Sequence, residues 1–298
     1  MTAPTVAETA ALWEAAWPGR VPHPRGLADR LGEPSGWAWR RDQAGRLVAL
    51  AVFRPPESSS HGHLRLLLTH PGVRGTGLGR ALVAEVRDRL GPVALAVGEE
   101  RGHFLPGAPD ESAGFFDRVG FTRTGRVSVD MVADLRPALP EAPLPAGLRL
   151  TDAGEEGILS GVQTLTDSVF SARWTHDATA VATRSPGQLL ALMDGEQMVG
   201  FALVGTEDDP VILPSFLSPG ALRAAVGTRE RAGGLGPIGI HPDLRGGGVG
   251  RAFMLAAMRH LREEGVEAMD VDWTGIAPFY ERLGFRVWAR YVHCRLPG

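Results

Sequence analysis

The sequence contains no lysine, no asparagine and a single cysteine, Cys294. The lone cysteine excludes a disulfide framework and a thiolate zinc site within the chain, and we expect no metal site. Without lysine there is neither a Walker A phosphate loop nor Schiff-base chemistry. No apolar run reaches the roughly 18 residues that a membrane span needs, and residues 1–17 lack the basic start of a signal peptide. We therefore expect a cytoplasmic protein that does not enter a membrane.

The sequence also lacks an excess of positive charge. All 31 basic residues are arginine, they are outnumbered by 34 acids, and the net charge is −3. Nucleic-acid-binding domains usually carry a basic excess, so we expect no nucleic-acid partner. The 298 residues suffice for two domains of ordinary size, and the apolar content of 44% is typical of globular proteins.

An internal repeat is the most informative feature that is present. Residues 69–81 read THPGVRGTGLGRA, and residues 240–252 read IHPDLRGGGVGRA. A second pair of similar segments follows in the same order, FFDRVGF at 115–121 and FYERLGF at 279–285. Two blocks that recur in the same order indicate duplication of a whole domain, because chance similarity of glycine-rich loops would not repeat the second block.

The boundary between the copies is predicted from proline. Residues 134–147 contain four prolines and little periodic apolarity, and proline disfavours both helix interiors and central strands. We predict a first domain over residues 1–137, a linker over 138–147 and a second domain over 148–298.

Each copy of the glycine-rich segment lies between a predicted strand and a predicted helix. Residues 63–69 and 236–240 have the composition of strands, and residues 78–90 and 249–264 have helical apolar spacing. Strands and helices alternate in both halves, which indicates a mixed α/β fold for each.

The glycine segments have the chemistry of an anion site. Arg-Gly-x-Gly-x-Gly presents backbone amides without obstructing Cβ atoms, and the following helix N-terminus adds partial positive charge. Both favour a phosphate or pyrophosphate. The alternative is a tight turn without a ligand, but the repetition of the loop with the same flanking residues favours an anion site. A nicotinamide fold fits poorly, because its pattern is GxGxxG near the start of the unit, whereas here several strands precede a GxGxG loop.

Arg74-Gly75-Thr76-Gly77-Leu78-Gly79 and Arg245-Gly246-Gly247-Gly248-Val249-Gly250 resemble the R/Q-x-x-G-x-G/A signature of the GCN5-related N-acetyltransferases, the GNAT superfamily. The resemblance covers both halves and implies two tandem GNAT domains, each with a central mixed, mostly antiparallel sheet flanked by helices. It implies acetyl-CoA as cofactor, with its pyrophosphate on the glycine loops. The cofactor-binding residues expected from it are Arg74, Gly75, Thr76, Gly77, Leu78, Gly79 and Arg80 in the first half and Ile238, Ile240, Arg245, Gly246, Gly247, Gly248, Val249, Gly250 and Arg251 in the second.

The resemblance also implies a catalytic acid. In many GNAT enzymes a tyrosine of the FY-x-x-x-GF block protonates the leaving thiolate, and Tyr280 occupies that position. The alternative for Tyr280 is a packed core tyrosine. Phe116 stands at the matching place in the first half and cannot donate a proton, so we predict that the second domain is catalytic. For the general base we favour Asp272 at a strand end, ahead of Asp270 and Glu267, although a water relay is an alternative.

Other positions are candidates for the acceptor site. His103 and Phe104 lie in a loop where GNAT acceptor sites often lie, and Trp273 stands where the family often has asparagine. The protein also loosely resembles a tandem group that includes bacterial glucosamine N-acetyltransferases. We therefore predict transfer of acetyl to the primary amine of a small molecule, with an amino sugar as one candidate. The alternatives are acetylation of a protein N-terminus or lysine, and a non-catalytic acyl-CoA-binding module.

Overall fold

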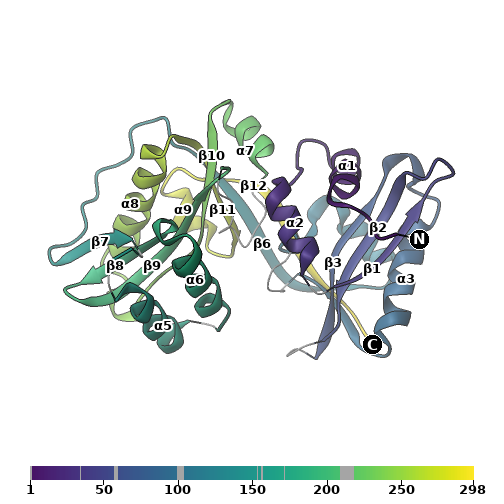
Figure 1. The fold of residues 1–298 in the computed structure, drawn as a ribbon, viewed down its shortest axis with the longest axis horizontal. Coiled ribbons are helices and arrows are strands. Elements are labelled where there is room, and N and C mark those ends of the chain that lie inside the picture. Colours follow the sequence, from purple (N-terminus) through teal and green to yellow (C-terminus); the bar gives the residue numbers. More distant parts are fainter. Residues whose placement is uncertain are drawn as a thin grey trace. The chain divides into compact units, whose positions relative to one another are not determined.

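The computed structural model describes residues 2–33, 35–56, 60–98, 104–152, 154–155, 157–170, 172–208 and 218–298. The chain forms two compact units (Figure 1). The first contains Met1–Asp130, Trp273–Gly275 and Val287–Gly298, and the second contains Met131–Asp272 and Ile276–Arg286. Across the described residues, none of the helices is both long enough and apolar enough to span a bilayer.

The sheet of the first unit has the order β1-β2-β3-β4-β12. Strands β1, β2 and β3 pair in antiparallel fashion, β4 is parallel to β3, and β12 is antiparallel to β4. The strands that lie wholly or partly in this unit are β1 (Gly36–Arg41), β2 (Leu47–Arg54), β3 (His61–Thr69), β4 (Ala94–Val97), β5 (Ala108–Pro109), β6 (Thr122–Asp134) and β12 (Arg286–Leu296). The helices are α1 (Val6–Ala16), α2 (Pro24–Gly32), α3 (Leu78–Leu90) and α4 (Ala113–Arg118).

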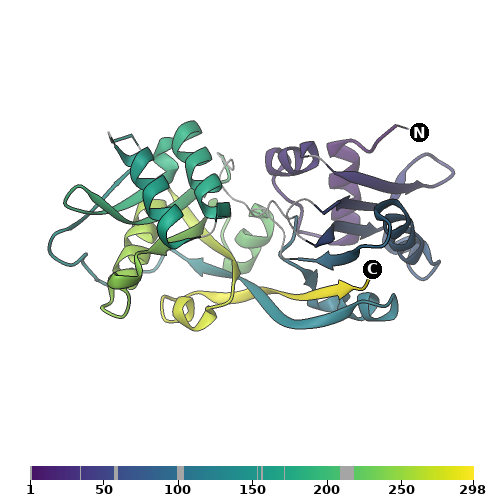
Figure 2. The ribbon, with the colours of Figure 1, turned by 90° about the horizontal axis from the view of Figure 1, so that it is seen from below.

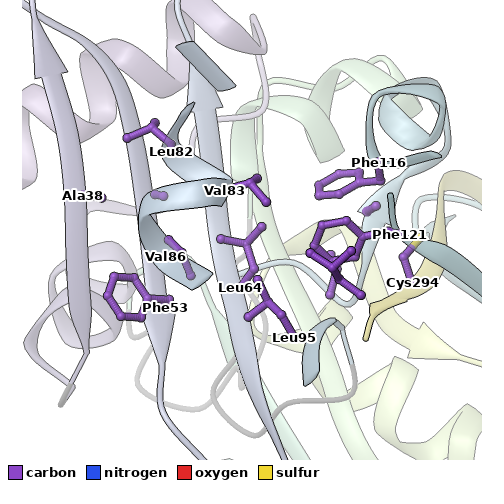
Figure 3. Packing of buried hydrophobic residues seen from close by; sticks show 14 of the residues in the cluster. Ala38, Phe53, Leu64, Leu82, Val83, Val86, Leu95, Phe116, Phe121 and Cys294 are labelled. Carbon is purple, nitrogen blue, oxygen red and sulfur yellow. The ribbon is translucent and has the colours of Figure 1, made fainter. Parts of the chain in front are cut away.

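Strand β2 is buried on both faces. Ala49, Ala51 and Phe53 belong to a core cluster that includes residues of α3, as Figure 3 shows for Phe53 beside the helix. Leu50 and Val52 point the opposite way, since side chains alternate along a strand, and they are also fully buried. Helix α1 contacts β2. Helices therefore cover both faces of this sheet, which explains why β2 is an almost continuous apolar run rather than an alternating one.

The last strand of the chain completes the first unit. Cys294, Arg295 and Leu296 of β12 pair with Val97, Ala96 and Leu95 of β4, and Tyr291 and Val292 pair with β5. Cys294 packs beside Phe121 in the core (Figure 3), and Figure 2 shows the yellow C-terminal strand ending there. The compact units are therefore not contiguous in sequence, and the domain boundary at 138–147 stays a prediction about the repeat. Residues 135–147 form neither helix nor strand.

The second unit repeats the arrangement. Its strand order is β11-β10-β9-β8-β7, with β10 parallel to β11 and the other neighbours antiparallel. The strands are β7 (Leu148–Asp152), β8 (Leu189–Asp194), β9 (Gln197–Thr206), β10 (Arg231–Ile240) and β11 (Val266–Thr274). The helices are α5 (Ile158–Val169), α6 (Ala172–Arg184), α7 (Pro219–Val226), α8 (Val249–Glu263) and α9 (Ala277–Glu281). The predicted mixed, mostly antiparallel α/β fold is confirmed.

The parallel strands of each unit stay paired over only part of their length. Strand β3 pairs with β4 from His61–Ala94 to His63–Ala96 and then continues to Thr69. Strand β10 pairs with β11 up to Leu235–Val271 and then continues to Ile240. In each unit the part of the strand beyond this pairing keeps only its antiparallel neighbour, and it leads through a 3-10 turn into the glycine loop. The loops therefore lie where the two parallel strands separate.

Candidate active site

Each glycine loop begins with a histidine-capped turn. Strand β3 is followed by the 3-10 turn Pro71–Val73, in which Nδ1 of His70 accepts the N–H of Gly72 at 3.1 Å. In the second unit Nδ1 of His241 accepts the N–H of Asp243 at 3.3 Å. Both imidazoles therefore hold the backbone where it leaves the strand, which is a structural use and explains why the His-Pro pair is repeated.

The glycines of the loops adopt backbone conformations that other residues avoid. Gly75 and Gly77 have φ of 83° and 88°, and Gly246 and Gly248 have φ of 85° and 84°. A Cβ built on any of these four meets no atom within 4 Å. Glycine is therefore required by the left-handed backbone rather than by crowding, and the space in front of both loops is open.

The two helices that follow begin without a capping side chain. Gly77 and Gly248 are the N-cap residues of α3 and α8, and in the described part of the chain no side chain accepts from the first amides of either helix. The first N–H groups of a helix have no intrahelical partner, and together with the helix dipole they attract anions. Each loop is therefore a candidate site for a phosphate group.

The leading arginines bind backbone oxygens. Nη2 of Arg74 donates to the carbonyl of Ala16 at 2.7 Å, and its Nε donates to Thr69 O at 3.4 Å. Nη2 of Arg245 donates to Ile240 O at 3.4 Å. The two arginines therefore tie the loops to neighbouring backbone, and Arg74 also holds the C-terminal end of α1. Thr76 donates its hydroxyl to Val73 O at 2.7 Å.

A cavity of about 830 Å³ lies in front of the first loop. Its walls are the end of β3 from Leu64 to Thr69, the loop and first turn of α3, Trp17 and part of α4. Of the residues predicted to hold the cofactor in this half, six line it: Arg74, Gly75, Gly77, Leu78, Gly79 and Arg80. Phe116 lines it as well. The cavity is large enough for a substantial part of a nucleotide-sized ligand.

Tyr280 and Phe116 have similar surroundings within their own units. Tyr280 is 5% exposed and its ring makes edge-to-face contacts with Phe279 and Phe285, at centroid distances of 5.0 and 5.7 Å. Phe116 is also 5% exposed and contacts Phe115 and Phe121 in the same manner, both at 5.3 Å. The FFDRVGF and FYERLGF blocks therefore pack alike around these two rings, and the hydroxyl of Tyr280 is the chemical difference between the two aromatic positions.

The environment of Tyr280 keeps its hydroxyl protonated. Burial, reinforced by the negative charge of Asp272, raises the pKa of Tyr280 to about 12. Asp272 lies on β11 in the same unit, and a Cβ built on Gly236 of β10 would lie 3.1 Å from its Oδ1. A tyrosine with a raised pKa remains a proton donor at neutral pH. Asp270, the second candidate base, is buried on the same strand at 3% exposure.

The predicted acceptor residues lie in different surroundings. His103 is outside the described residues. Phe104 is 1% exposed and packs between the ring of Trp13, at 6.5 Å, and the guanidinium carbon of Arg65, at 5.0 Å. Its ring is therefore part of the core of the first unit. Trp273 belongs to that unit too, and its backbone N–H donates to Oδ1 of Asp130 at 2.9 Å.

Two polar clusters escaped the sequence analysis. Asp130 is buried on β6 and accepts a hydrogen bond from Tyr291 as well as from Trp273. Glu33 joins three arginines in the first unit. Asp130 could have been singled out from the sequence, because it is the one acid in the apolar segment VSVDMVA at 127–133. Among the described residues, no group of three His, Cys, Asp or Glu side chains could hold a metal.

Comparison with known proteins identifies the family. The pattern of the acetyltransferase (GNAT) family matches residues 6–100 and 160–285. The chain belongs to the GNAT family. Both copies of the glycine-rich segment lie within the match, so the predicted tandem organisation and N-acetyltransferase activity are confirmed. Acetyltransferases of this family take their acetyl group from acetyl-CoA.

Individual relatives support this placement. The mycothiol acetyltransferase of Thermobispora bispora is 31% identical over 278 residues, which cover 88% of this chain and 84% of the relative. The enzyme of the same name from Frankia alni is 30% identical, over 76% of this chain and 68% of its own.

Solved structures agree on the fold of this GNAT protein. A tandem GNAT protein from the clavulanic acid biosynthesis pathway has a TM-score of 0.69 at 19% identity, covering 98% of this chain and 94% of its own. A glucosamine N-acetyltransferase region of a fungal β-N-acetylglucosaminidase has a TM-score of 0.75 at 18% identity, covering 98% of this chain and 37% of that one.

Proposed function

We propose that this GNAT enzyme transfers the acetyl group of acetyl-CoA directly to the primary amine of a small molecule, with the second half of the chain as the catalytic half. The observation that carries the proposal is the pairing, in one unit, of an uncapped glycine loop with a buried tyrosine that stays protonated. The first half has an equivalent loop but phenylalanine at the tyrosine position.

The loop residues fit the cofactor. Arg245, Gly246, Gly247, Gly248, Val249, Gly250 and Arg251 would hold the pyrophosphate of the cofactor in the second half, and Arg74 to Arg80 would hold it in the first. Support comes from the open space over the glycines and from the helix amides without a side-chain cap. Acetyl-CoA would supply the activated acetyl group. Ile238 and Ile240 would offer backbone contacts to the thioester, and support comes from their place on the part of β10 beyond its pairing with β11.

The proton transfers are assigned to two side chains. Tyr280 Oη–H would donate its proton to the sulfur that leaves when the amine nitrogen takes the acetyl group. The amine loses a proton to Asp272, directly or through water. The hydroxyl of Tyr280 is protonated before the reaction, because burial and the charge of Asp272 raise its pKa, so it carries the proton that the leaving sulfur needs. The same negative charge that accepts the amine proton keeps the phenol neutral.

The first half is proposed to bind the cofactor without turning it over. Its cavity of about 830 Å³ includes six of the predicted loop residues, but Phe116 cannot donate a proton. Binding there would stabilise the folded protein by an amount that rises with the logarithm of the ligand concentration once the site is mostly occupied.

The acceptor is proposed from the relatives. Two proteins that are 30% or more identical are named mycothiol acetyltransferases, so a small-molecule amine of that type is the first candidate and an amino sugar is the second.

The test is a screen of amines with the full-length protein. Acetyl-CoA is incubated with amino sugars, aminoglycosides, polyamines, amino acids and peptides, and released thiol and acetylated product are measured together. We expect turnover of a small-molecule amine with one acetyl group added per thiol released. Exclusive acetylation of peptides would replace the proposed acceptor by a protein. Binding of acetyl-CoA without turnover of any amine would indicate a binding module.

A further inference from the structure

Trp273 has a backbone conformation that an aromatic residue rarely adopts. Its φ is 44°, which makes it the one residue other than glycine with positive φ among the described residues. The left-handed region is strained for residues with a Cβ, and it persists only where surrounding contacts enforce it. Trp273 directly follows Asp272, so the contacts that enforce this conformation also act on the backbone next to the proposed base.

A buried carboxylate supplies the enforcing contact. Oδ1 of Asp130 accepts the backbone N–H of Trp273 at 2.9 Å, although the two residues are 143 positions apart in the sequence. Oδ2 of Asp130 accepts the hydroxyl of Tyr291 at 2.7 Å. Asp130 and Tyr291 are 6% and 3% exposed. Three strands therefore contribute to one hydrogen-bonded cluster: β6 through Asp130, β11 through Trp273 and β12 through Tyr291.

The conformation of Trp273 decides where its neighbours point. In a regular strand, successive side chains alternate between the two faces. A residue with positive φ interrupts this alternation. The direction of the Asp272 carboxylate relative to the residues that follow therefore depends on the φ of Trp273, and that φ depends on its hydrogen bond to Asp130.

We propose that Asp130 is a positioning residue: its carboxylate holds Trp273 in the left-handed conformation and so orients the end of β11 that carries Asp272. This inference rests on the proposed function, since it gives Asp272 a part in proton transfer. Tyr291 assists by orienting the carboxylate of Asp130. Neither Asp130 nor Tyr291 touches a reacting atom in this account.

The first experiment measures the hydrogen bond itself, without reference to activity. In protein labelled with ¹⁵N-tryptophan, the Trp273 amide is assigned by its loss in Trp273→Gly. We expect slow hydrogen exchange at this amide in the wild type and in Asp130→Asn, whose side-chain oxygen still accepts. We expect exchange faster by about tenfold or more in Asp130→Ala. Unchanged exchange in Asp130→Ala would overturn the proposal.

The matched control is Ser128→Ala. Ser128 lies two residues earlier on β6, is equally buried, and bonds to Nε2 of His293 on β12 at 2.9 Å. Its removal costs a buried hydrogen bond between the same two strands without touching Trp273. We expect this variant to keep the Trp273 amide protected and to keep its turnover.

The second experiment measures turnover with the amine that the wild type accepts. Asp130→Ala should lower kcat about ten- to a hundredfold, because small displacements of a catalytic group are costly, with less change in the KM for acetyl-CoA. Asp130→Asn should recover most of that loss. Equal damage in both variants would mean that the charge, and not positioning, matters, and would overturn the proposal. If Asp130→Ala does not fold, Tyr291→Phe provides a milder test, with an expected loss of about threefold in kcat.

A double-mutant cycle separates positioning from general destabilisation. Glycine adopts positive φ freely, so Trp273→Gly should make the backbone less dependent on Asp130. In that background Asp130→Ala should lower kcat by less than about threefold, whereas additive effects would overturn the proposal. A wild type that acetylates no amine would instead refute the proposed function, and amide exchange would still decide whether Asp130 holds Trp273.

Discussion

Tyr280 and Phe116 occupy equivalent positions in the two halves of the chain, in matching edge-to-face aromatic clusters, and differ by one hydroxyl group. Duplication has therefore preserved the packing of this segment while its chemistry has diverged. The substitution isolates a single oxygen atom as the proposed difference between a catalytic and a non-catalytic half.

Removing that oxygen from the second half tests the assignment. Tyr280→Phe should lower kcat about a hundredfold, in the range typical of a lost general acid. The affinity for acetyl-CoA, measured by calorimetry, should change little because the ring and its packing remain. Phe116→Tyr serves as the matched control and should not raise turnover on its own. Wild-type kcat in Tyr280→Phe across the pH range would refute the acid role.

The ionisation of Tyr280 can be observed directly, because the chain has only two tyrosines. In Tyr291→Phe, ultraviolet absorbance of the phenolate should report Tyr280 alone, with a pKa of about 12 rather than the usual 10. Since the pKa is raised, the protonated form is favoured in the folded protein, and kcat should show no loss from tyrosine ionisation below about pH 10. The free energy of unfolding should fall between about pH 10 and pH 12. A midpoint near 10 would contradict the burial of the hydroxyl.

The glycine loops are tested by a pair of substitutions on one helix. Gly248 and Gly265 flank α8, have φ of 84° and 83°, and have no atom near a built Cβ. Valine at either position should cost about 1–2 kcal/mol of stability. Only Gly248→Val should remove acetyl-CoA from the second unit, reducing the binding stoichiometry from two to one by calorimetry. Equal stoichiometry in the two variants would argue against the loop as the pyrophosphate site.

Glu33 should be critical for the stability of the first unit. It accepts from Arg30 at 2.8 Å and from Arg65 at 2.7 Å and also pairs with Arg54, and the side chain of Arg65 is fully buried. Glu33→Ala strands that buried charge and should lower the free energy of unfolding by about 3 kcal/mol. Glu85→Ala is the control, because Glu85 also pairs with two arginines but they are exposed, and it should cost under about 1 kcal/mol. Similar losses in denaturant titrations would contradict this account.

The same carboxyl group predicts a pH dependence of stability. Burial opposes the ionisation of Glu33, but the charges of Arg30 and Arg65 outweigh it and lower its pKa. A lowered pKa means that this contribution to stability is present above about pH 4.5 and is lost as the pH falls below it. In Glu33→Gln, the free energy of unfolding should lose part of its dependence on pH in this acid range. An unchanged pH dependence would place the carboxyl group outside the ion cluster.

Local features of the fold could be predicted because their causes are local. Helix α3 begins and ends at the predicted residues, Leu78 and Leu90, since glycine at each end and an apolar stripe between them define it. Helix α2 (Pro24–Gly32) was missed because PRGLADRLG is short and mostly polar, and its single buried residue is Leu27.

Parts of the site depend on contacts between distant residues and could not be predicted. Nothing next to Trp273 signals its positive φ, which is enforced by Asp130 from another strand. The burial of Phe104 follows from its packing against Trp13 and Arg65, whereas its loop context suggested an accessible position. Tyr280, in contrast, could be proposed as the acid from the sequence alone, because the repeat marks the block in which it lies.

The pairing of Cys294–Leu296 with β4 has a consequence for biosynthesis. These residues are synthesised after the whole second half of the repeat, so the edge of β4 stays without this partner until then. An exposed edge of this kind invites pairing with other chains. Expression of residues 1–137 alone should therefore give an aggregating fragment, because the edge of β4 has no partner in it.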